Sequence, residues 1–402
     1  MVSLKLAILG TRGVPPNYGG FETFAAELST RLVRRGHQVS VYCRETGAPV
    51  WNGVQRIVLP AAGHKYLETV SHAFLSAVDA LRRDFDAILV CNAANAFVLP
   101  LLRAAGIPVA INVDGIERKR RKWNVLGRAV YAAGEALSVS FANAVIADAE
   151  VIAEYYREHY AASPVVIPYG AEFPDEEDSD VLPRLGVRPG EYILYVSRFE
   201  PENNPLEVVL AYEKAMGPMG QMGPVGSHPP NPQSSILNPQ SPISPSALGP
   251  QPSALLPLIM LGKGLYAKDL VETLHRHASN QIRFPGALYD RDYRTLQRNA
   301  LIYIQATEVG GTHPALIEAM ASGGRVLAHD TSENREVGGD AVGYFQLRPA
   351  ETLSGMLREW LSEPQTREDY RLRARRRAAG RYSWENVTDA YESLFEAISG
   401  AR

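Results

Sequence analysis

Short apolar runs alternate with longer amphipathic segments along most of the chain. The first unit predicts a strand at Leu4–Leu9, a glycine-rich loop over 10–20, a helix at Phe21–Arg35 and a strand at Gln38–Cys43. The helix is indicated by apolar residues spaced three and four apart, and Gly36 is a suitable stop. A strand, a helix and a second strand in this order predict a βαβ unit, which builds a parallel sheet.

The alternation runs to about residue 170 and begins again near residue 192. In the first series we expect further helices at 68–83, 96–105 and 126–141 and strands at 87–91, 108–113, 144–147 and 165–170. In the second series we expect a helix at 206–215 and strands at 192–197, 258–261, 282–284, 301–305, 326–328 and 343–345. Because 402 residues exceed one typical core, the pattern predicts an α/β protein with two Rossmann-like, doubly wound parallel-sheet domains, at 1–172 and 173–381.

The interval from about 216 to 257 interrupts this rhythm. It is rich in Pro, Gly, Ser, Gln and Met and has no apolar period. Such a composition buries too little surface to offset the entropy lost on ordering. We expect a disordered surface insertion in the second domain, with a proline-rich partner-binding segment as the alternative.

The net charge and the cysteine content argue against a nucleic-acid-binding protein and against a disulfide-stabilised one. The net charge of −3 and the pI near 6.3 give no general attraction to nucleic acid. Cys43 and Cys91, the only cysteines, both lie in apolar runs, which indicates buried thiols in a reducing compartment. Since neither a secretory leader nor a run of 18 apolar residues is visible, we expect a cytoplasmic protein that at most contacts the inner face of the cell membrane.

Residues 301–327 carry the clearest chemical signal. An apolar strand is followed by a loop and first helical turn that comprise Gly310, Gly311, Thr312, His313 and Pro314. Bare glycine backbone and the positive end of a helix dipole favour an anion such as phosphate, with Thr312 or His313 as cap. Glu318, one turn into the helix, can accept hydrogen bonds from neighbouring hydroxyl groups. Phosphate beside hydroxyls suggests a nucleotide sugar, and the alternative is an ordinary corner of an α/β sheet.

Gly19 and Gly20 place the same bare backbone at the start of the first domain's first helix. We therefore expect one phosphate-binding helix start in each domain. The competing interpretation is a dinucleotide fingerprint that begins at Gly10 and Gly13. That fingerprint lacks its third glycine and the acidic residue about 20 positions further on, so it is disfavoured.

Charged residues follow several predicted strands, where open α/β sheets bind ligands. Arg198 and Lys263 follow strands of the second domain and can bind a diphosphate and stabilise its charge as it departs, unless they are ordinary surface cations. Asp114 ends a strand of the first domain and can bind a sugar or acceptor hydroxyl; an Asp-Gly turn is the alternative. The cationic run 118–122, preceded by Glu117, either forms a solvated face or attracts an anionic acceptor or membrane.

Asp290 and Asp292 have the spacing of the aspartate pair that holds a divalent ion in metal-dependent transferases. We instead expect Asp290 to cap a helix, because no further carboxylates or histidines cluster nearby in the sequence. Hydrolase and zinc signatures are absent from the sequence. No cofactor and no metal are therefore predicted.

Together these segments resemble glycosyltransferase family four, a retaining family of GT-B architecture, and in particular its bacterial rhamnosyltransferase-like members of surface polysaccharide biosynthesis. The motifs that carry the resemblance are LGTRGVPPNYGGFETFAAEL, NVDGIERKRRKW, IPYGAE, SRFEPENN, EVGGTHPALIEAMASG and YSWENVTDAYESLF. The resemblance implies two Rossmann-like domains that face a cleft. It also implies that a final helical segment, 382–402, packs back on the first domain.

The resemblance also implies roles for individual residues. Arg198, Glu318 and Asp114 are the expected catalytic set; the expected donor-binding residues are Gly19, Gly20, Arg198, Asn204, Lys263, Gly310, Gly311, Thr312, His313 and Glu318. The expected acceptor-binding residues are Asp114, Glu117, Arg118 and Lys119. Two positions depart from the wider family, since Gly310 replaces a glutamate that contacts the donor sugar and Asn203-Asn204 replaces a lysine.

The expected activity is transfer of a hexose or deoxyhexose, with rhamnose favoured, from a nucleotide-diphosphate sugar. The expected acceptor is a glycan or a lipid-diphosphate-linked glycan, which fits a peripheral contact with the membrane. Two alternatives remain open at this point: a catalytically inactive sugar-nucleotide or glycan-binding protein on the same fold, and a metal-dependent transferase that uses Asp290 and Asp292.

Overall fold

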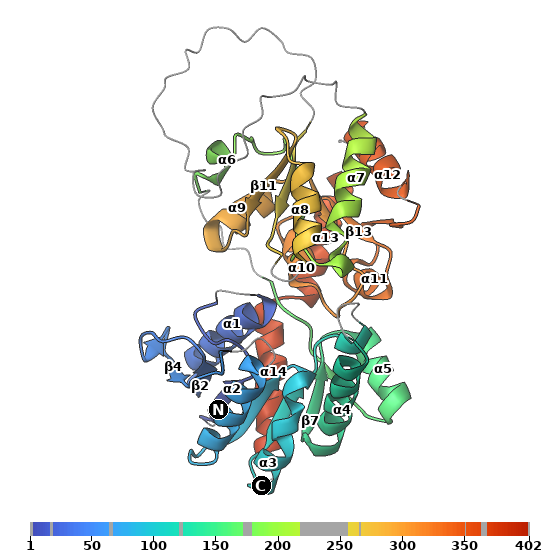
Figure 1. The fold of residues 1–402 in the computed structure, drawn as a ribbon. Helices are drawn as coiled ribbons and strands as arrows, with labels where there is room; N and C mark the ends of the chain where they lie inside the picture. The colour runs from blue at the N-terminus through green and yellow to red at the C-terminus, as the bar shows by residue number, and fades with distance from the viewer. Residues whose placement is uncertain are drawn as a thin grey trace.

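The computed structural model describes residues 3–16, 19–63, 67–119, 124–171, 179–217, 256–264, 267–349, 351–362 and 368–400. These residues form two α/β lobes stacked one on the other (Figure 1). The predicted insertion at 216–257 lies almost entirely outside the described residues, and so do most of the linker and residues 120–122 of the cationic run.

The first lobe contains an eight-stranded sheet in the order β3-β4-β2-β1-β5-β6-β7-β8. Its strands are β1 (Lys5–Leu9), β2 (Gln38–Cys43), β3 (Val50–Trp51), β4 (Val54–Val58), β5 (Ala87–Cys91), β6 (Val109–Asn112), β7 (Ala144–Ala147) and β8 (Val165–Val166). Its helices are α1 (Gly20–Arg34), α2 (Glu68–Ala80), η1 (Ala93–Val98), α3 (Leu99–Ala104), η2 (Glu117–Lys119), α4 (Val125–Phe141) and α5 (Glu150–Tyr160). All neighbouring strands are parallel except β3 and β4, which form an antiparallel hairpin.

The second lobe contains a six-stranded, all-parallel sheet in the order β11-β10-β9-β12-β13-β14. Its strands are β9 (Ile193–Val196), β10 (Leu258–Leu261), β11 (Ile282–Gly286), β12 (Ile302–Gln305), β13 (Val326–His329) and β14 (Gly343–Phe345). Its helices are α6 (Val181–Arg184), η3 (Pro201–Asn203), α7 (Pro205–Met216), α8 (Lys268–Arg276), α9 (Asp290–Asn299), α10 (Pro314–Ala321), α11 (Ser332–Gly338), α12 (Glu351–Ser362) and α13 (Glu368–Arg381). Both sheets confirm the predicted pair of Rossmann-like domains.

The differences from the predicted elements have simple causes. The hairpin of β3 and β4 was not predicted, because β4 lies near the sheet edge and its five residues, with two polar positions in the middle, show no regular alternation of buried and exposed positions. The helix predicted at 96–105 is divided into a 3-10 turn and α3, with Pro100 in the first turn of α3. The strand predicted at 165–170 is paired only at Val165–Val166.

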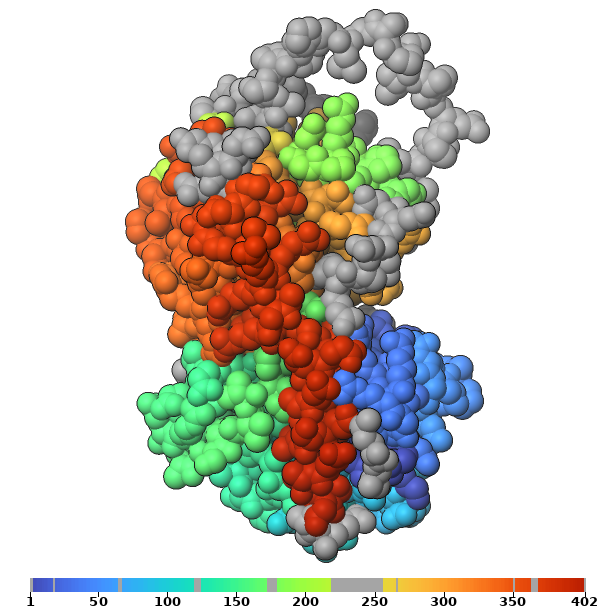
Figure 2. Space-filling view, turned by 180° about the vertical axis from the view of Figure 1, so that it is seen from behind, coloured from blue at the N-terminus to red at the C-terminus, as the bar shows by residue number. Residues whose placement is uncertain are grey.

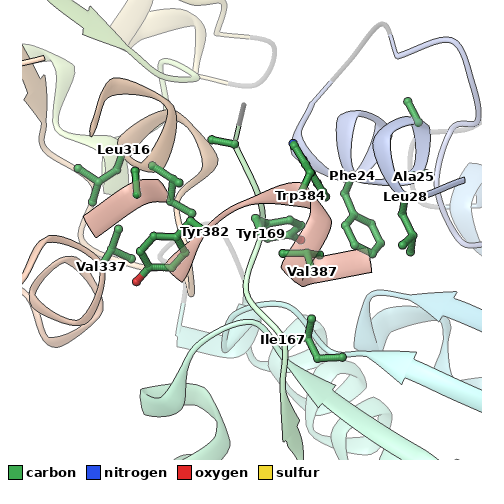
Figure 3. Packing of buried hydrophobic residues seen from close by; sticks show 14 of the residues in the cluster. Phe24, Ala25, Leu28, Ile167, Tyr169, Leu316, Val337, Tyr382, Trp384 and Val387 are labelled. Atoms are coloured by element: carbon green, nitrogen blue, oxygen red, sulfur yellow. The ribbon is translucent and has the colours of Figure 1, made fainter. Parts of the chain in front are cut away.

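Buried apolar side chains continue from one lobe into the other. In the junction shown in Figure 3, Phe24 of α1 lies edge-to-face with Tyr169, with ring centroids 5.5 Å apart. The ring centroid of Tyr391 lies 5.3 Å from that of Phe24. The same cluster includes Leu316 of α10 and Tyr382, which belong to the second lobe. The two sheets therefore share one continuous apolar contact beside the place where the chain passes between them.

The last described helix, α14 (Trp384–Ser399), returns to the first lobe. Figure 2 shows it in red, running from the upper lobe across the back of the lower one. Arg35, at the end of α1, forms ion pairs of 2.6 to 2.7 Å with the carboxylates of Glu385, Asp389 and Glu392 on α14. His37 lies 2.8 Å from the other oxygen of Glu392. Charged contacts thus anchor the helix along one side.

Candidate active site

The starts of α1 and α10 face each other across the lobe boundary. Gly20 is the first residue of α1, and a Cβ built on it would lie 3.4 Å from Cγ of Pro314, the first residue of α10. A Cβ on Gly115 would approach Gly310 to 2.9 Å. The loop that precedes α10 therefore meets the first lobe at both the start of α1 and the end of β6.

The amide of Thr312 already has a partner from the first lobe in this conformation. Thr312 N donates a hydrogen bond of 2.7 Å to Oδ2 of Asp148, the residue directly after β7 of the first lobe. The Thr312 hydroxyl donates to the Asp148 carbonyl instead of capping α10, and the N-cap residue His313 makes no side-chain cap either. The expectation that one of these side chains caps the helix was wrong, because the opposite lobe supplies the partner.

A second carboxylate crosses the boundary in the opposite direction. Glu336 of α11 accepts hydrogen bonds from the amides of Glu150, at 2.7 Å, and Val151, at 3.0 Å, which are the first residues of α5. Unpaired amides at a helix start favour such an anionic cap. Each lobe thus contributes one carboxylate to an amide of the other.

Arg198 and Lys263 lie on adjacent loops at the carboxyl edge of the second sheet. Phe199 N donates to the Lys263 carbonyl at 3.1 Å, so the two chain segments are hydrogen-bonded to each other, and both cationic side chains are exposed. Asn203 donates to the Arg198 carbonyl at 2.7 Å. Asn204 is buried in a left-handed backbone conformation and donates to the Ala306 carbonyl at 2.8 Å, which fixes the arginine loop against the loop that leads to α10.

Glu318 lies one turn into α10 and is held by a neighbouring helix. The hydroxyl of Tyr293 on α9 donates to its Oε2. Burial raises the pKa of Glu318 above its ordinary value, although the Tyr293 hydrogen bond acts in the opposite direction.

The predicted acceptor residues separate into two groups. Asp114 lies at the boundary beside Gly115, in a left-handed conformation, and the Tyr169 hydroxyl donates to it at 3.4 Å. Arg118 instead turns toward α4 and α5, where its guanidinium contacts the Tyr155 hydroxyl and lies 3.4 Å from Glu135. Glu117 is buried, and Lys119 is the last residue of η2.

Arg118 also lines an open pocket of about 550 Å³. The residues that line it are Arg118, Arg128, Ala129, Tyr155 and His159, which come from η2, α4 and α5. The structure therefore brings Asp114 to the loop of α10, whereas Arg118 belongs to a neighbouring surface.

Asp290 and Asp292 lie in the first turn of α9. Asp290 is the first residue of α9 and not its cap, which is Tyr289, so the predicted capping role was wrong. Asp292 pairs with Arg184 of α6. Within the described ranges, no group of three or more His, Cys, Asp or Glu side chains is arranged to hold a metal ion.

Asp148 and Glu336 were missed in the sequence. Asp148 stands immediately after a strand of a parallel sheet, and this position is the one signal that could have identified it. An isolated aspartate before a helix is equally typical of a cap. Glu336 lies within α11, and no feature of the neighbouring sequence distinguishes it from other helical glutamates.

Two family models match the chain, and together they cover well over half of it. The model described as Glycosyltransferase Family 4 matches residues 18–172, and the model described as Glycosyl transferases group 1 matches residues 254–377. These ranges correspond to the two lobes. The chain is a glycosyltransferase of the GT-B fold.

Solved glycosyltransferase structures share this fold at low sequence identity. Sucrose-phosphate synthase from Thermosynechococcus elongatus is 16% identical with a TM-score of 0.77, covering 99% of this chain and 100% of the other. HepE from Anabaena, in complex with UDP-glucose, is 15% identical with a TM-score of 0.74, covering 98% and 99%. Trehalose 6-phosphate synthase from Burkholderia multivorans is 12% identical with a TM-score of 0.69, covering 100% and 98%. A search of curated proteins gave no match.

Proposed function

We propose that this glycosyltransferase moves a hexose or deoxyhexose, with rhamnose favoured, from a nucleotide-diphosphate sugar to a glycan or lipid-linked glycan in surface polysaccharide biosynthesis. The proposal rests mainly on the apposition of Gly20 and Pro314, which sets the first residues of α1 and α10 against each other at the lobe boundary. Arg198 and Lys263 add positive charge at the carboxyl edge of the second sheet, on two loops that are hydrogen-bonded to each other.

The proposed reaction retains the configuration of the anomeric carbon. The bond between that carbon and the diphosphate oxygen breaks, and the acceptor oxygen forms its new bond on the same face of the sugar. The acceptor proton passes to the departing diphosphate oxygen. Arg198, Lys263 and the amides of the loop before α10 stabilise the charge on the leaving group, and no metal ion is required.

A nucleotide sugar is also supported by the neighbours. The HepE structures contain UDP, UDP with glucose, or UDP-glucose. At 15 to 16% identity the HepE structures show a shared fold, so the base and the sugar have to be identified by experiment. We therefore suggest a panel of dTDP-, UDP- and GDP-sugars, with thermal shift as the first measurement and transfer or donor hydrolysis as the second. A binding protein without activity would be stabilised by a donor and would release no nucleoside diphosphate.

Arg198 is the residue on which the proposal is most easily tested. Replacing Arg198 with Ala removes a charge-assisted contact to the leaving group, so we expect turnover with the best donor to fall about 100-fold. Arg276→Ala is the matched control, because Arg276 is an exposed arginine on α8 of the same lobe. Equal turnover of the two variants, at unchanged melting temperature, would remove Arg198 from the site.

A further inference from the structure

Asp148 is buried at the boundary between the lobes and has one oxygen without a partner among the described residues. Its side chain is 1% exposed, and Oδ2 accepts the hydrogen bond from Thr312 N. Oδ1 has no hydrogen-bond partner there. A buried carboxyl oxygen loses its hydration, so natural proteins rarely leave one unpaired unless a ligand completes the site.

Gly311 provides the space that Asp148 occupies. A Cβ built on Gly311 would lie 2.0 Å from Oδ1 and 2.3 Å from Oδ2 of Asp148. No other residue type at position 311 could leave the carboxyl group where it is. The Thr312 hydroxyl also holds the Asp148 carbonyl, so one loop of the second lobe fixes both the backbone and the side chain of this residue.

We propose that Asp148 recognises a hydroxyl group of the transferred sugar through Oδ1, and this inference rests on the proposed function. The second lobe holds the diphosphate and the first lobe presents the acceptor, so the sugar must lie where the lobes meet. The loop before α10 meets the first lobe at Gly115 and Asp148. Of these two residues, only Asp148 has a side chain, and its buried Oδ1 has no hydrogen-bond partner among the described residues.

The surroundings of Asp148 disfavour the charged form of its side chain. Burial raises its pKa well above the ordinary value, and the nearby Asp114 carboxylate raises it further. Whether or not Oδ1 carries a proton, it can accept a hydrogen bond from a sugar hydroxyl.

The proposal is tested by removing the hydrogen bond between Asp148 and the sugar in two ways, once by changing the enzyme and once by changing the donor. Transfer is measured with the preferred donor and with its analogues that each lack one sugar hydroxyl, for the unmodified enzyme and for Asp148→Ala. At one hydroxyl position we expect its removal to lower kcat/KM of the unmodified enzyme about 10- to 100-fold. The same removal should change the Asp148→Ala variant less than twofold. If the losses in kcat/KM from Asp148→Ala and from removal of a sugar hydroxyl are additive at every hydroxyl position, the proposal is overturned.

Two further variants separate recognition from a structural role. Asp148→Asn has nearly the same shape and keeps one accepting oxygen, so it should restore part of the lost selectivity; if Asp148→Ala does not fold, Asp148→Asn carries the same comparison. Glu336→Ala is the matched control, because it removes the other carboxylate contact between the lobes. Glu336→Ala should leave unchanged the ratio of kcat/KM for the complete donor to kcat/KM for the donor that lacks one sugar hydroxyl. Loss of that ratio in Glu336→Ala would mean that closure, and not Asp148, determines selectivity.

The affinity for the nucleoside diphosphate without sugar distinguishes this inference from the proposed function. We expect its Kd to change less than threefold in Asp148→Ala. A marked gain in affinity would show that Asp148 occupies the place of the diphosphate, which would overturn the inference. If the unmodified enzyme transfers no sugar from any donor, the proposed function itself fails.

Discussion

Glu318 shows how one carboxyl group is balanced between burial and hydrogen bonding. Burial raises its pKa, and the hydroxyl of Tyr293 lowers it less than burial raises it. The group therefore takes up a proton at a higher pH than the ordinary value of 4.5. If Glu318 accepts a ribose hydroxyl, as the resemblance implies, this contact weakens when the group is protonated.

We expect Glu318→Gln to lower the affinity for the nucleoside diphosphate about tenfold, because a hydrogen bond to a charged group contributes roughly 1.5 kcal/mol. The affinity of the unmodified enzyme should also fall as the pH decreases toward the raised pKa, and the variant should lack this step. Isothermal titration between pH 5 and 8 measures both effects. Glu272→Gln, an exposed glutamate on α8, is the control. Equal affinities for the two variants would assign Glu318 a structural role.

Some residues of the candidate site could be predicted, and others could not. The positions of Gly310, Gly311 and Arg198 in loops after strands of the second lobe could be predicted from the apolar runs that precede them, and their roles in binding stay predictions. The contact of Asp148 could not be predicted, because it depends on which loop of the other lobe lies opposite. That pairing is a property of the folded molecule and leaves no local trace in the sequence.

Among the elements, α14 is attached to the first lobe by a group of ion pairs centred on Arg35. Arg35 binds three of its carboxylates, and two of these, on Glu385 and Asp389, are largely exposed. Exposed ion pairs contribute little on their own, so the buried contact of Glu392 with Arg35 and His37 should dominate. Burial raises the pKa of Glu392, but the hydrogen bonds from His37 and Arg35 leave it below its ordinary value of 4.5.

A carboxyl group with a lowered pKa in the folded state stabilises the protein above its unfolded pKa. This contribution is lost as the pH falls below about 4.5 toward the lowered pKa. We expect Arg35→Ala to weaken the attachment of α14 by about 1–2 kcal/mol. Hydrogen exchange of the α14 amides measures the change, with the exposed neighbour Arg34→Ala as control. Unchanged protection in Arg35→Ala would show that apolar packing alone holds the helix.

The element pattern was more predictable than the site because both sheets are buried on two faces. Their strands are short apolar runs, and Gln38–Cys43, Ala87–Cys91 and Ala144–Ala147 have the predicted bounds. The hairpin of β3 and β4 lies near an edge, and its strands of two and five residues have no strand-like alternation of polar and apolar positions. Such short runs are not distinguishable from a loop by their composition.

At the scale of the whole molecule, α4 presents an apolar surface to the solvent. Val125, Leu126 and Val130 are 84%, 73% and 56% exposed, and Arg128 lies among them. The first cations of the basic run, Arg118 and Lys119, precede this helix. None of the described helices is long and apolar enough to cross a membrane. We propose that this face contacts an anionic membrane surface, where a lipid-linked acceptor would be held.

This contact predicts binding to vesicles that contain phosphatidylserine, measured by co-sedimentation. Leu126→Gln should weaken binding about fivefold, because roughly 1 kcal/mol of apolar burial is lost. Leu372→Gln is the matched control, since Leu372 is 51% exposed on α13 of the other lobe. Binding should also decrease with added salt. If both variants bind like the unmodified protein, the α4 face does not contact lipid.

The chain passes between the lobes after Ala171 and again near Tyr382, and Ala171 N donates to the Tyr382 carbonyl at 2.7 Å. Gly170 lies directly against Trp384, where a Cβ would approach the indole to 2.5 Å. Because Ala171 and Tyr382 are joined in this way, we expect any opening of the lobes to bend the two segments together at this point. Each cycle of opening and closing would then return the carboxyl group of Asp148 to the amide of Thr312, so the two lobes would close in the same relative position each time.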